Sequence, residues 1–236
     1  MTKPSLTALI GKNNLGDKRW STFVDGGDGF WYGIPYHAPR VVKFDPLSKS
    51  SAWTEIGPDF GDGIGDEYDE TCAEKWSCGL LLANNGSIYY APFNAEHILK
   101  ININDGTVET LDNVELPETS ALLWASGTLA TDNHIYYMPA DASLIMRLNP
   151  DNDSLSSVRD DLEGRGFGDN YSGTLVWNDD YVYGIPSRAT RIAKFDPSNP
   201  DTTSTVGEEA QEYVECGNGV LAGDGQIYAA NGAGQV

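Results

Sequence analysis

An all-β repeat fold is predicted by three features of this chain. A phrase built on Tyr, Pro, Ala, an aliphatic pair and a cation recurs along it, short alternating apolar stretches lie between Gly- and Asn-rich turns, and no stretch has the apolar period of a capped helix. The marker tyrosines of the phrase, Tyr32, Tyr89, Tyr136, Tyr183 and Tyr228, are 57, 47, 47 and 45 positions apart. This period is typical of blade-like repeats. We therefore expect a five-bladed β-propeller of four-stranded antiparallel blades.

The second copy of the repeat shows how one blade would form. Small and apolar residues suit a crowded inner strand, the turns Asn84-Asn85-Gly86 and Asn104-Asp105-Gly106 tolerate positive φ, and β-branched residues favour the last strand. The four strands, which we call A to D from the propeller axis outward, are predicted over residues 76–83, 87–92, 97–102 and 107–111.

The whole chain, residues 1–236, is expected to be one domain, because a single repeat is too small to bury its own apolar faces. The predicted blades cover approximately residues 20–58, 76–113, 124–160, 171–207 and 213–236. The fifth copy stops at Val236 before its outer strands. Residues 1–11, which contain a possible D strand over 5–11, are expected to dock on this last blade, so that the ring closes between the N- and C-terminal strands.

Antiparallel alternation sorts the connections onto two faces. The A–B and C–D hairpin turns lie on one face, which we call the turn face. The longer and more variable B–C loops and D–A connections lie on the other, which we call the loop face. Variable loops on a rigid scaffold commonly carry function. The candidate ligand-binding residues are the polar and aromatic residues of the B–C loops: Tyr36, His37, Arg40, Asn94, His97, Asp141, Arg188 and Arg191.

The most regular chemical feature is a cation on strand C, present as Lys43, Lys100, Arg147 and Lys194. A basic ring for an anion is one interpretation. We favour a structural role, with each cation paired either to the Asx two positions later or to an acid of a neighbouring blade. The repeated tyrosine is likewise expected to be a core residue whose hydroxyl bonds to the backbone, and the Asx-Pro pairs are expected to be turns.

One D–A connection, residues 59–70, is acidic and Gly-rich. Clustered carboxylates of such a loop bind calcium through oxygen, and Asp62, Asp66 and Asp69 are the candidate ligands. The segment lacks the spacing of an EF-hand, and a solvated loop is the alternative. His37, His97 and His134 fall in different blades with no carboxylate or cysteine at ligand spacing, which argues against a transition-metal site.

The charge limits the partners. The formal net charge is −20, from 35 acidic against 15 basic residues, so nucleic acid and anionic membranes would be repelled. The three cysteines argue against a disulfide framework. No signal peptide and no stretch of transmembrane length is visible, and the localisation is left open. We expect a monomer with a protein or carbohydrate ligand.

The phrase Trp76-x-x-Gly79-Leu80 followed by Gly86-x-Ile88-Tyr89-x-x-Pro92-x-x-Ala95-x-x-Ile98-Leu99-Lys100-Ile101 resembles the repeat of kelch-like propeller proteins of algae and other protists. The resemblance spans almost the whole chain. The Gly-Gly pair with spaced Tyr and Trp that marks kelch repeats is not kept. The resemblance implies a binding scaffold and brings no catalytic residues with it.

Three functions remain open. The first is a non-catalytic scaffold that binds a protein or a glycan through the loop face. The second is a propeller enzyme of the glycosidase or lyase type, with carboxylates at the channel mouth. The inner strands argue against it, because only Asp25 and Glu215 lie near suitable positions. The third is a structural fragment of a longer repeat array.

Overall fold

The computed structural model describes the chain in blocks that correspond to the repeats. The described residues are 20–48, 53–61, 75–76, 83–116, 123–158, 171, 180–187, 189–207, 216–222, 224 and 226–231. In this part of the chain every regular element is a β-strand. No helix there is long and apolar enough to cross a membrane.

Sixteen strands form five sheets in the described residues. The first sheet contains β1 (Trp20–Asp25), β2 (Trp31–Pro35), β3 (Val41–Phe44) and β4 (Trp53–Ile56). The second contains β5 (Ser87–Tyr90), β6 (Leu99–Asn102) and β7 (Val108–Thr110). The third contains β8 (Trp124–Leu129), β9 (Ile135–Pro139), β10 (Ile145–Asn149) and β11 (Ser154–Val158). The fourth contains β12 (Val182–Gly184), β13 (Ile192–Asp196) and β14 (Asn199–Val206), and the fifth β15 (Cys216–Leu221) and β16 (Ile227–Asn231).

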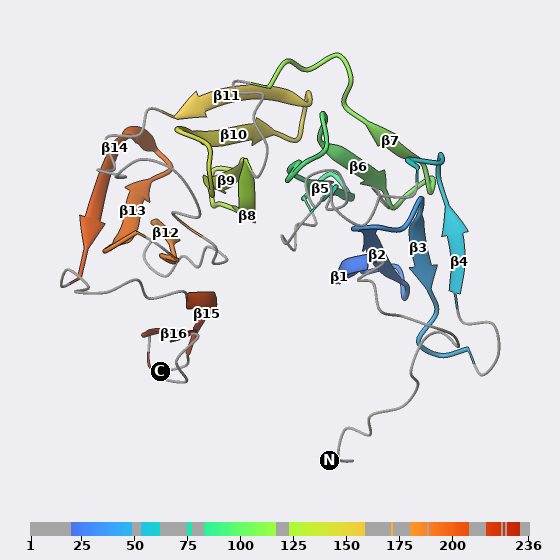
Figure 1. Cartoon of the computed structure of the whole chain (residues 1–236), viewed down its shortest axis with the longest axis horizontal. Helices are drawn as coiled ribbons and strands as arrows, with labels where there is room; N and C mark the ends of the chain where they lie inside the picture. Colours follow the sequence, from blue (N-terminus) through green and yellow to red (C-terminus); the bar gives the residue numbers. More distant parts are fainter. Residues whose placement is uncertain are drawn as a thin grey trace, which may run out of the picture.

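Each sheet is an antiparallel meander in chain order, as the repeat predicts. Figure 1 shows the five sheets side by side along an arc, with β4, β7, β11 and β14 on its outer side. The first and third sheets show all four predicted strands. Most of the A strand predicted over 76–83 and the D strand predicted over 5–11 lie outside the described residues.

The hydrophobic core lies between neighbouring sheets, because successive side chains of a strand point to opposite faces. On β5, Ile88 and Tyr90 belong to the cluster shared with the first sheet, whereas Tyr89 belongs to the cluster shared with the third. All three are fully buried. A third cluster joins the third and fourth sheets through residues such as Tyr136 and Phe195. A middle sheet therefore buries both of its faces, which is why its strands are apolar at consecutive positions.

The turns also form as their residues predict. Gly86 and Gly106 adopt positive φ of 75° and 74° in the two turns of the second sheet. The Asx residues of the Asx-Pro pairs at the end of strand C accept a hydrogen bond from the backbone N–H two positions later, at 2.8 Å for Asp45, 2.9 Å for Asn149 and 2.8 Å for Asp196. The prediction that the Asx-Pro pairs make turns is confirmed.

Two repeats place a glycine and an aromatic residue opposite each other on strands A and B, but on exchanged strands. In the first sheet Phe23 of β1 lies opposite Gly33 of β2, whereas in the third sheet Gly127 of β8 lies opposite Tyr137 of β9. A Cβ on Gly33 would lie 2.7 Å from the Phe23 ring, and a Cβ on Gly127 would lie 2.5 Å from the Tyr137 ring. Each aromatic ring thus occupies the space left by the glycine on the paired strand.

We predict that Gly127→Ala destabilises the protein by about 1–3 kcal/mol, because the added methyl overpacks a buried position. The double variant Gly127→Phe/Tyr137→Gly reproduces the arrangement of the first sheet and should be more stable than Gly127→Ala. Urea unfolding followed by tryptophan fluorescence measures both effects. A double variant no more stable than the single one would contradict the exchange.

Candidate functional site

A belt of backbone hydrogen bonds fixes the loop face between the first and second sheets. The N–H of Lys75 donates to the carbonyl of Tyr36 in the B–C loop of the first sheet, at 3.2 Å. The carbonyl of Lys75 accepts from the N–H groups of Phe93 and Ala95 in the B–C loop of the second sheet, at 3.0 and 3.1 Å. One residue therefore ties together two loops from neighbouring sheets.

The same arrangement recurs one repeat later. The N–H of Leu123 donates to the carbonyl of Phe93 at 3.2 Å, and its carbonyl accepts from Ala140 at 2.9 Å and Ala142 at 3.2 Å. Lys75 directly precedes Trp76, the first residue of a predicted A strand, and Leu123 directly precedes Trp124, the first residue of β8. The belt satisfies loop backbone groups that would otherwise be buried without a partner.

The opening tryptophans hold the other end of each B–C loop. The indole Nε1 of Trp20 donates to the carbonyl of Arg40 at 3.1 Å, and that of Trp76 donates to the carbonyl of His97 at 2.9 Å. Trp124 makes the equivalent bond to the carbonyl of Leu144 at 3.1 Å. The backbone of two candidate residues, Arg40 and His97, is therefore held by a neighbouring ring.

In the first sheet, the candidates Tyr36, His37 and Arg40 lie within one loop. Tyr36 is buried, and its ring meets the His37 ring edge-on with centroids 4.8 Å apart. The Arg40 guanidinium bonds to the carbonyl of Gly57 and lies 3.5 Å from the Asp59 carboxylate. Arg40 thus braces the B–C loop against the following D–A connection, while its side chain stays 36% exposed.

The other described candidates come from the next three sheets. Asn94 is half-buried and donates its backbone N–H to the carbonyl of Lys75, so the structure brings it to the same belt as Tyr36. The His97 ring lies 3.9 Å from the Asp112 carboxylate. Asp141 lies between β9 and β10 in the third sheet, and Arg191 directly precedes β13 in the fourth. Arg188 lies outside the described residues.

The calcium candidates Asp62, Asp66 and Asp69 also lie outside the described residues, so calcium binding there stays a hypothesis. Within the described part of the chain, no group of three or more His, Cys, Asp or Glu residues is arranged to hold a metal ion.

Lys75 is a loop-face residue that sequence reasoning missed. It is 8% exposed, and its Nζ donates to the carbonyl of Gly61 at 2.8 Å. A buried lysine is rare unless it is paired. In the sequence, Lys75 is marked only by its place directly before Trp76. The structure shows that the equivalent residue of the next repeat, Leu123, makes the same backbone hydrogen bonds.

The strand-C cations lie toward the opposite face, at the hairpin turns. In the first sheet, Asp28 of the A–B turn accepts from the Tyr32 hydroxyl at 2.8 Å and from Lys43 Nζ at 3.2 Å. In the third sheet, Asp132 accepts from Tyr136 at 2.8 Å and from Arg147 at 3.3 Å. The Tyr136 hydroxyl also contacts the backbone carbonyl of Pro197 at 3.4 Å, as expected, but its nearer partner is the carboxylate. In these two sheets the cation pairs with the carboxylate of its own A–B turn, so the expected pairing with the following Asx is wrong here. A carboxylate four residues before the tyrosine joins both groups.

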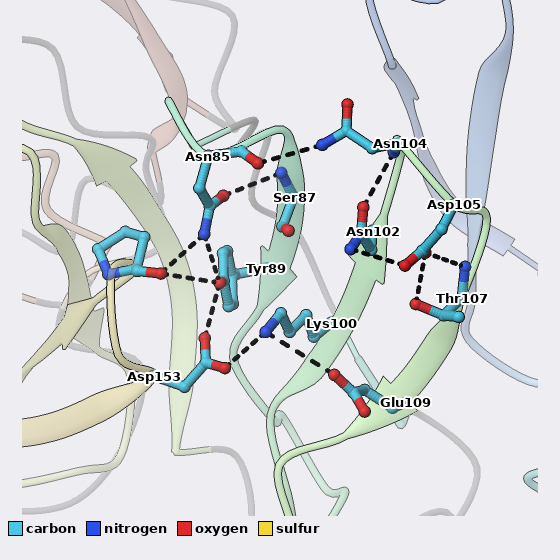
Figure 2. A network of polar contacts seen from close by, with 11 residues as sticks. Asn85, Ser87, Tyr89, Lys100, Asn102, Asn104, Asp105, Thr107, Glu109 and Asp153 are labelled. Carbon is cyan, nitrogen blue, oxygen red and sulfur yellow. Dashed lines mark hydrogen bonds and ion pairs between the residues drawn. The ribbon is translucent and has the colours of Figure 1, made fainter.

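The second sheet obtains its carboxylate from a neighbour (Figure 2). The position four residues before Tyr89 is Asn85, and Asp153 of the third sheet reaches across instead. Its carboxylate lies 2.7 Å from the Tyr89 hydroxyl and 2.5 Å from Lys100 Nζ. Pairing with an acid of a neighbouring blade is thus confirmed for Lys100. Asp153 has a φ of 58°, an uncommon conformation for a residue with a side chain.

The pKa shifts of these groups follow from their burial and from their bonds to one another. Burial is the largest influence on Asp28 and acts to raise its pKa, but hydrogen bonds from Tyr32, Phe30 and Lys43 together lower it. Burial likewise opposes the charge of Lys100, yet its contact with Asp153 leaves its pKa raised. Burial raises the pKa of Tyr136. At neutral pH Asp28 and Lys100 therefore stay charged and Tyr136 stays neutral, which suits each of them to structural pairing.

Comparison with known proteins identifies the fold class. No family model matches the chain, and no curated protein matches it either. Among solved structures, it resembles virginiamycin B lyase from Staphylococcus aureus, with 15% identity and a TM-score of 0.60 over 89% of this chain and 68% of the lyase.

It also resembles the extracellular domain of a putative hybrid two-component system from B. thetaiotaomicron, with 14% identity and a TM-score of 0.63 over 94% of this chain and 26% of that one. An auxiliary nutrient binding protein from Bacteroides ovatus gives 12% identity and a TM-score of 0.61, covering 93% of this chain and 58% of the other. The lyase and this extracellular domain are β-propellers. At such identities the likeness shows the fold alone, which is a propeller-like all-β architecture.

We predict that Asp153→Asn destabilises the protein by about 1–3 kcal/mol, because Lys100, whose side chain is only 16% exposed, loses its closest carboxylate. Asn tolerates the left-handed backbone, so this change tests the charge rather than the turn. Chemical denaturation at pH 7 measures the loss. Asp151→Asn in the same exposed turn is the matched control and should stay within about 0.5 kcal/mol.

Adding Asn85→Asp to Asp153→Asn should restore part of the lost stability, because position 85 then carries the carboxylate as Asp28 does in the first sheet. If Asp153→Asn is as stable as the unmodified protein, the neighbour-supplied carboxylate has no role in stability. If the double variant is no more stable than Asp153→Asn, position 85 cannot supply the carboxylate in its place.

Proposed function

We propose that this protein is a non-catalytic binding scaffold that recognises a protein or a carbohydrate through the loop face. The observation that carries the proposal is the belt, which fixes the backbone of the B–C loops while leaving polar side chains accessible. His37, Arg40 and His97 are partly exposed, and Arg191 is exposed. Rigid loops with accessible polar and aromatic groups lose little conformational entropy when a ligand binds.

Three of the described acids are held in turns and are not suited to act as general acids. A general acid of the glycosidase type needs a raised pKa. The pKa of Asp105 is lowered, first by the Thr107 backbone N–H, and that of Asp224 is lowered, first by the Gln226 backbone N–H. Asp28 is also shifted down. These three carboxylates are therefore suited to holding turns, and a lyase or glycosidase activity remains the alternative function.

A glycan array probed with the labelled full chain, with and without calcium, tests the proposal. We expect one class of glycan to bind without being converted. The variant His37→Ala/Arg191→Ala should bind at least about tenfold more weakly, which corresponds to about 1.4 kcal/mol. Asp45→Asn/Asp151→Asn on the turn face is the control and should bind as the unmodified protein does.

Mass spectrometry of the bound glycan after incubation distinguishes the enzyme from the scaffold. A cleaved or eliminated product would overturn the non-catalytic proposal. If binding survives His37→Ala/Arg191→Ala but is lost in Asp45→Asn/Asp151→Asn, the ligand binds the turn face and the proposed location is wrong. If no glycan binds, the carbohydrate half of the proposal fails and only a protein ligand is left.

We further propose that the five sheets are blades of one five-bladed ring, closed between the N- and C-terminal strands. Supporting this, Trp31, Phe44 and Trp53 lie in register across the face of the first sheet that points away from the second. Their counterparts in the second sheet, Ile88, Ile101 and Val108, are buried against the first. Trp31 and Trp53 are instead 39% and 45% exposed.

The fifth sheet carries a matching uncovered residue. Tyr228 is 43% exposed, whereas its counterparts Tyr32, Tyr89 and Tyr136 are fully buried against the following sheet. The two ends of the arc therefore present the two halves of one sheet–sheet junction. The alternative is that further repeat units cover these faces in a longer array.

We predict that closure makes Trp53→Lys cost more than about 2 kcal/mol of stability, since it would place a charge in a packed junction. Leu47→Lys, at a position that is 87% exposed, is the control and should be nearly neutral. Small-angle X-ray scattering of the monomer should also fit a ring. Scattering from an open arc together with a tolerated Trp53→Lys would reject closure and favour the longer array.

A further inference from the structure

The outer strand of the second sheet is shorter than the outer strands of the two neighbouring sheets. This strand, β7, has three residues, whereas the outer strands on either side, β4 and β11, have four and five. Figure 1 shows β7 between these two strands on the outer side of the arc. An open groove of about 1100 Å³ follows β7 and reaches residues of all three sheets.

The floor of the groove is apolar. Val108 and Leu111 are nearly buried, and Phe60, Val114 and Leu155 are partly buried. Phe60 comes from the segment after β4, and Leu155 from β11. Side chains of an extended ligand could therefore contact the first and third sheets on both sides of β7.

The backbone of β7 offers an edge for pairing. Lys100 lies opposite Glu109, Asn102 bonds to Thr107, and Leu111 bonds to Ile98, so the hydrogen bonds to β6 come from alternate residues of this segment. By the same alternation, the N–H and C=O groups of Val108 and Thr110 point away from β6. In the described part of the second sheet β7 is an edge strand, and an exposed edge accepts an added strand.

The charge of the lining selects the ligand. The groove is lined by Glu109, Asp112, Glu115 and Asp153, and its described lining contains no Lys, Arg or His. The side chains of Glu109 and Asp112 are 57% and 65% exposed. Lys100 lies close to Glu109 and Asp153 and offsets one of these charges. A chain with a net charge of −20 also attracts cationic segments from a distance.

We propose that a basic, extended peptide segment of another protein binds this groove by adding a strand to β7. Its backbone pairs with Val108 and Thr110. Alternate side chains contact the apolar floor, and the lysine or arginine side chains between them meet Glu109, Asp112 and Glu115. This site lies on the outer edge of the arc and is separate from the loop face.

Fluorescence anisotropy with a fluorescein-labelled Lys-Val-Lys-Val-Lys-Val-Lys peptide and the full chain tests the proposal. We expect saturable binding that weakens at least about tenfold in Glu109→Gln/Asp112→Asn/Glu115→Gln. The matched control Asp45→Asn/Glu55→Gln/Asp151→Asn loses the same number of charges elsewhere and should bind within about twofold of the unmodified protein. Equal losses in the two triple variants would mean unspecific attraction and overturn the proposal.

Thr110→Pro tests strand addition, because it removes an outward N–H without removing a bond to β6. We expect at least about a tenfold loss of peptide binding. Hydrogen exchange on the unmodified protein gives an independent measurement: the peptide should slow exchange in residues 107–115. Protection confined to residues 36–40 would assign the peptide to the loop face, and unchanged exchange in 107–115 would exclude pairing with β7.

Discussion

The burial of both faces of each sheet is the constraint on which the rest of this structure depends. A sheet of three or four short strands has too little apolar area to fold alone, so each middle sheet packs against two neighbours. On β5 this requires apolar or aromatic residues at consecutive positions, and Ile88, Tyr89 and Tyr90 are all fully buried. Polar groups then lie at the two ends of the sheets and along the outer strands, such as β4 and β11, which meet solvent.

The two ends use their polar groups differently. At the turn face, side chains bond to one another: a carboxylate joins the tyrosine hydroxyl and the strand-C cation, as Asp28, Tyr32 and Lys43 show. At the loop face, backbone groups bond to one another, through residues such as Lys75. The turn-face groups are occupied by one another, whereas several loop-face side chains keep exposed polar atoms. This difference is the physical reason why we propose the loop face, and not the turn face, as the ligand-binding surface.

The sequence predicted most strands and turns because both depend on local properties. Alternating apolar residues and Asn-Gly or Asx-Pro turns act within a few residues, and the observed β5 and β6 lie inside the ranges expected for them. Contacts between repeats could not be predicted from such local properties. Asp153 is distant in sequence from Lys100, and only the packing of the second and third sheets shows that the two groups meet. The candidates Tyr36 and Asn94 could be assigned to loops, but not to the shared belt at Lys75.

The departures from the repeat gather around the second sheet. Asn85 stands where other copies have an acid, Asp153 compensates from the third sheet, and the shortest outer strand leaves the groove beside them. Asp153 therefore has two environments, because it holds Lys100 and also lines the groove. Its bond to Lys100 fixes the carboxylate in place, so its position does not have to be ordered when a cation approaches. Because Asp153 of the third sheet replaces the missing acid of the second, a preorganised carboxylate lies in the lining of the outer groove. In a strictly regular repeat this carboxylate would lie in the A–B turn of the second sheet, as Asp28 does in the first.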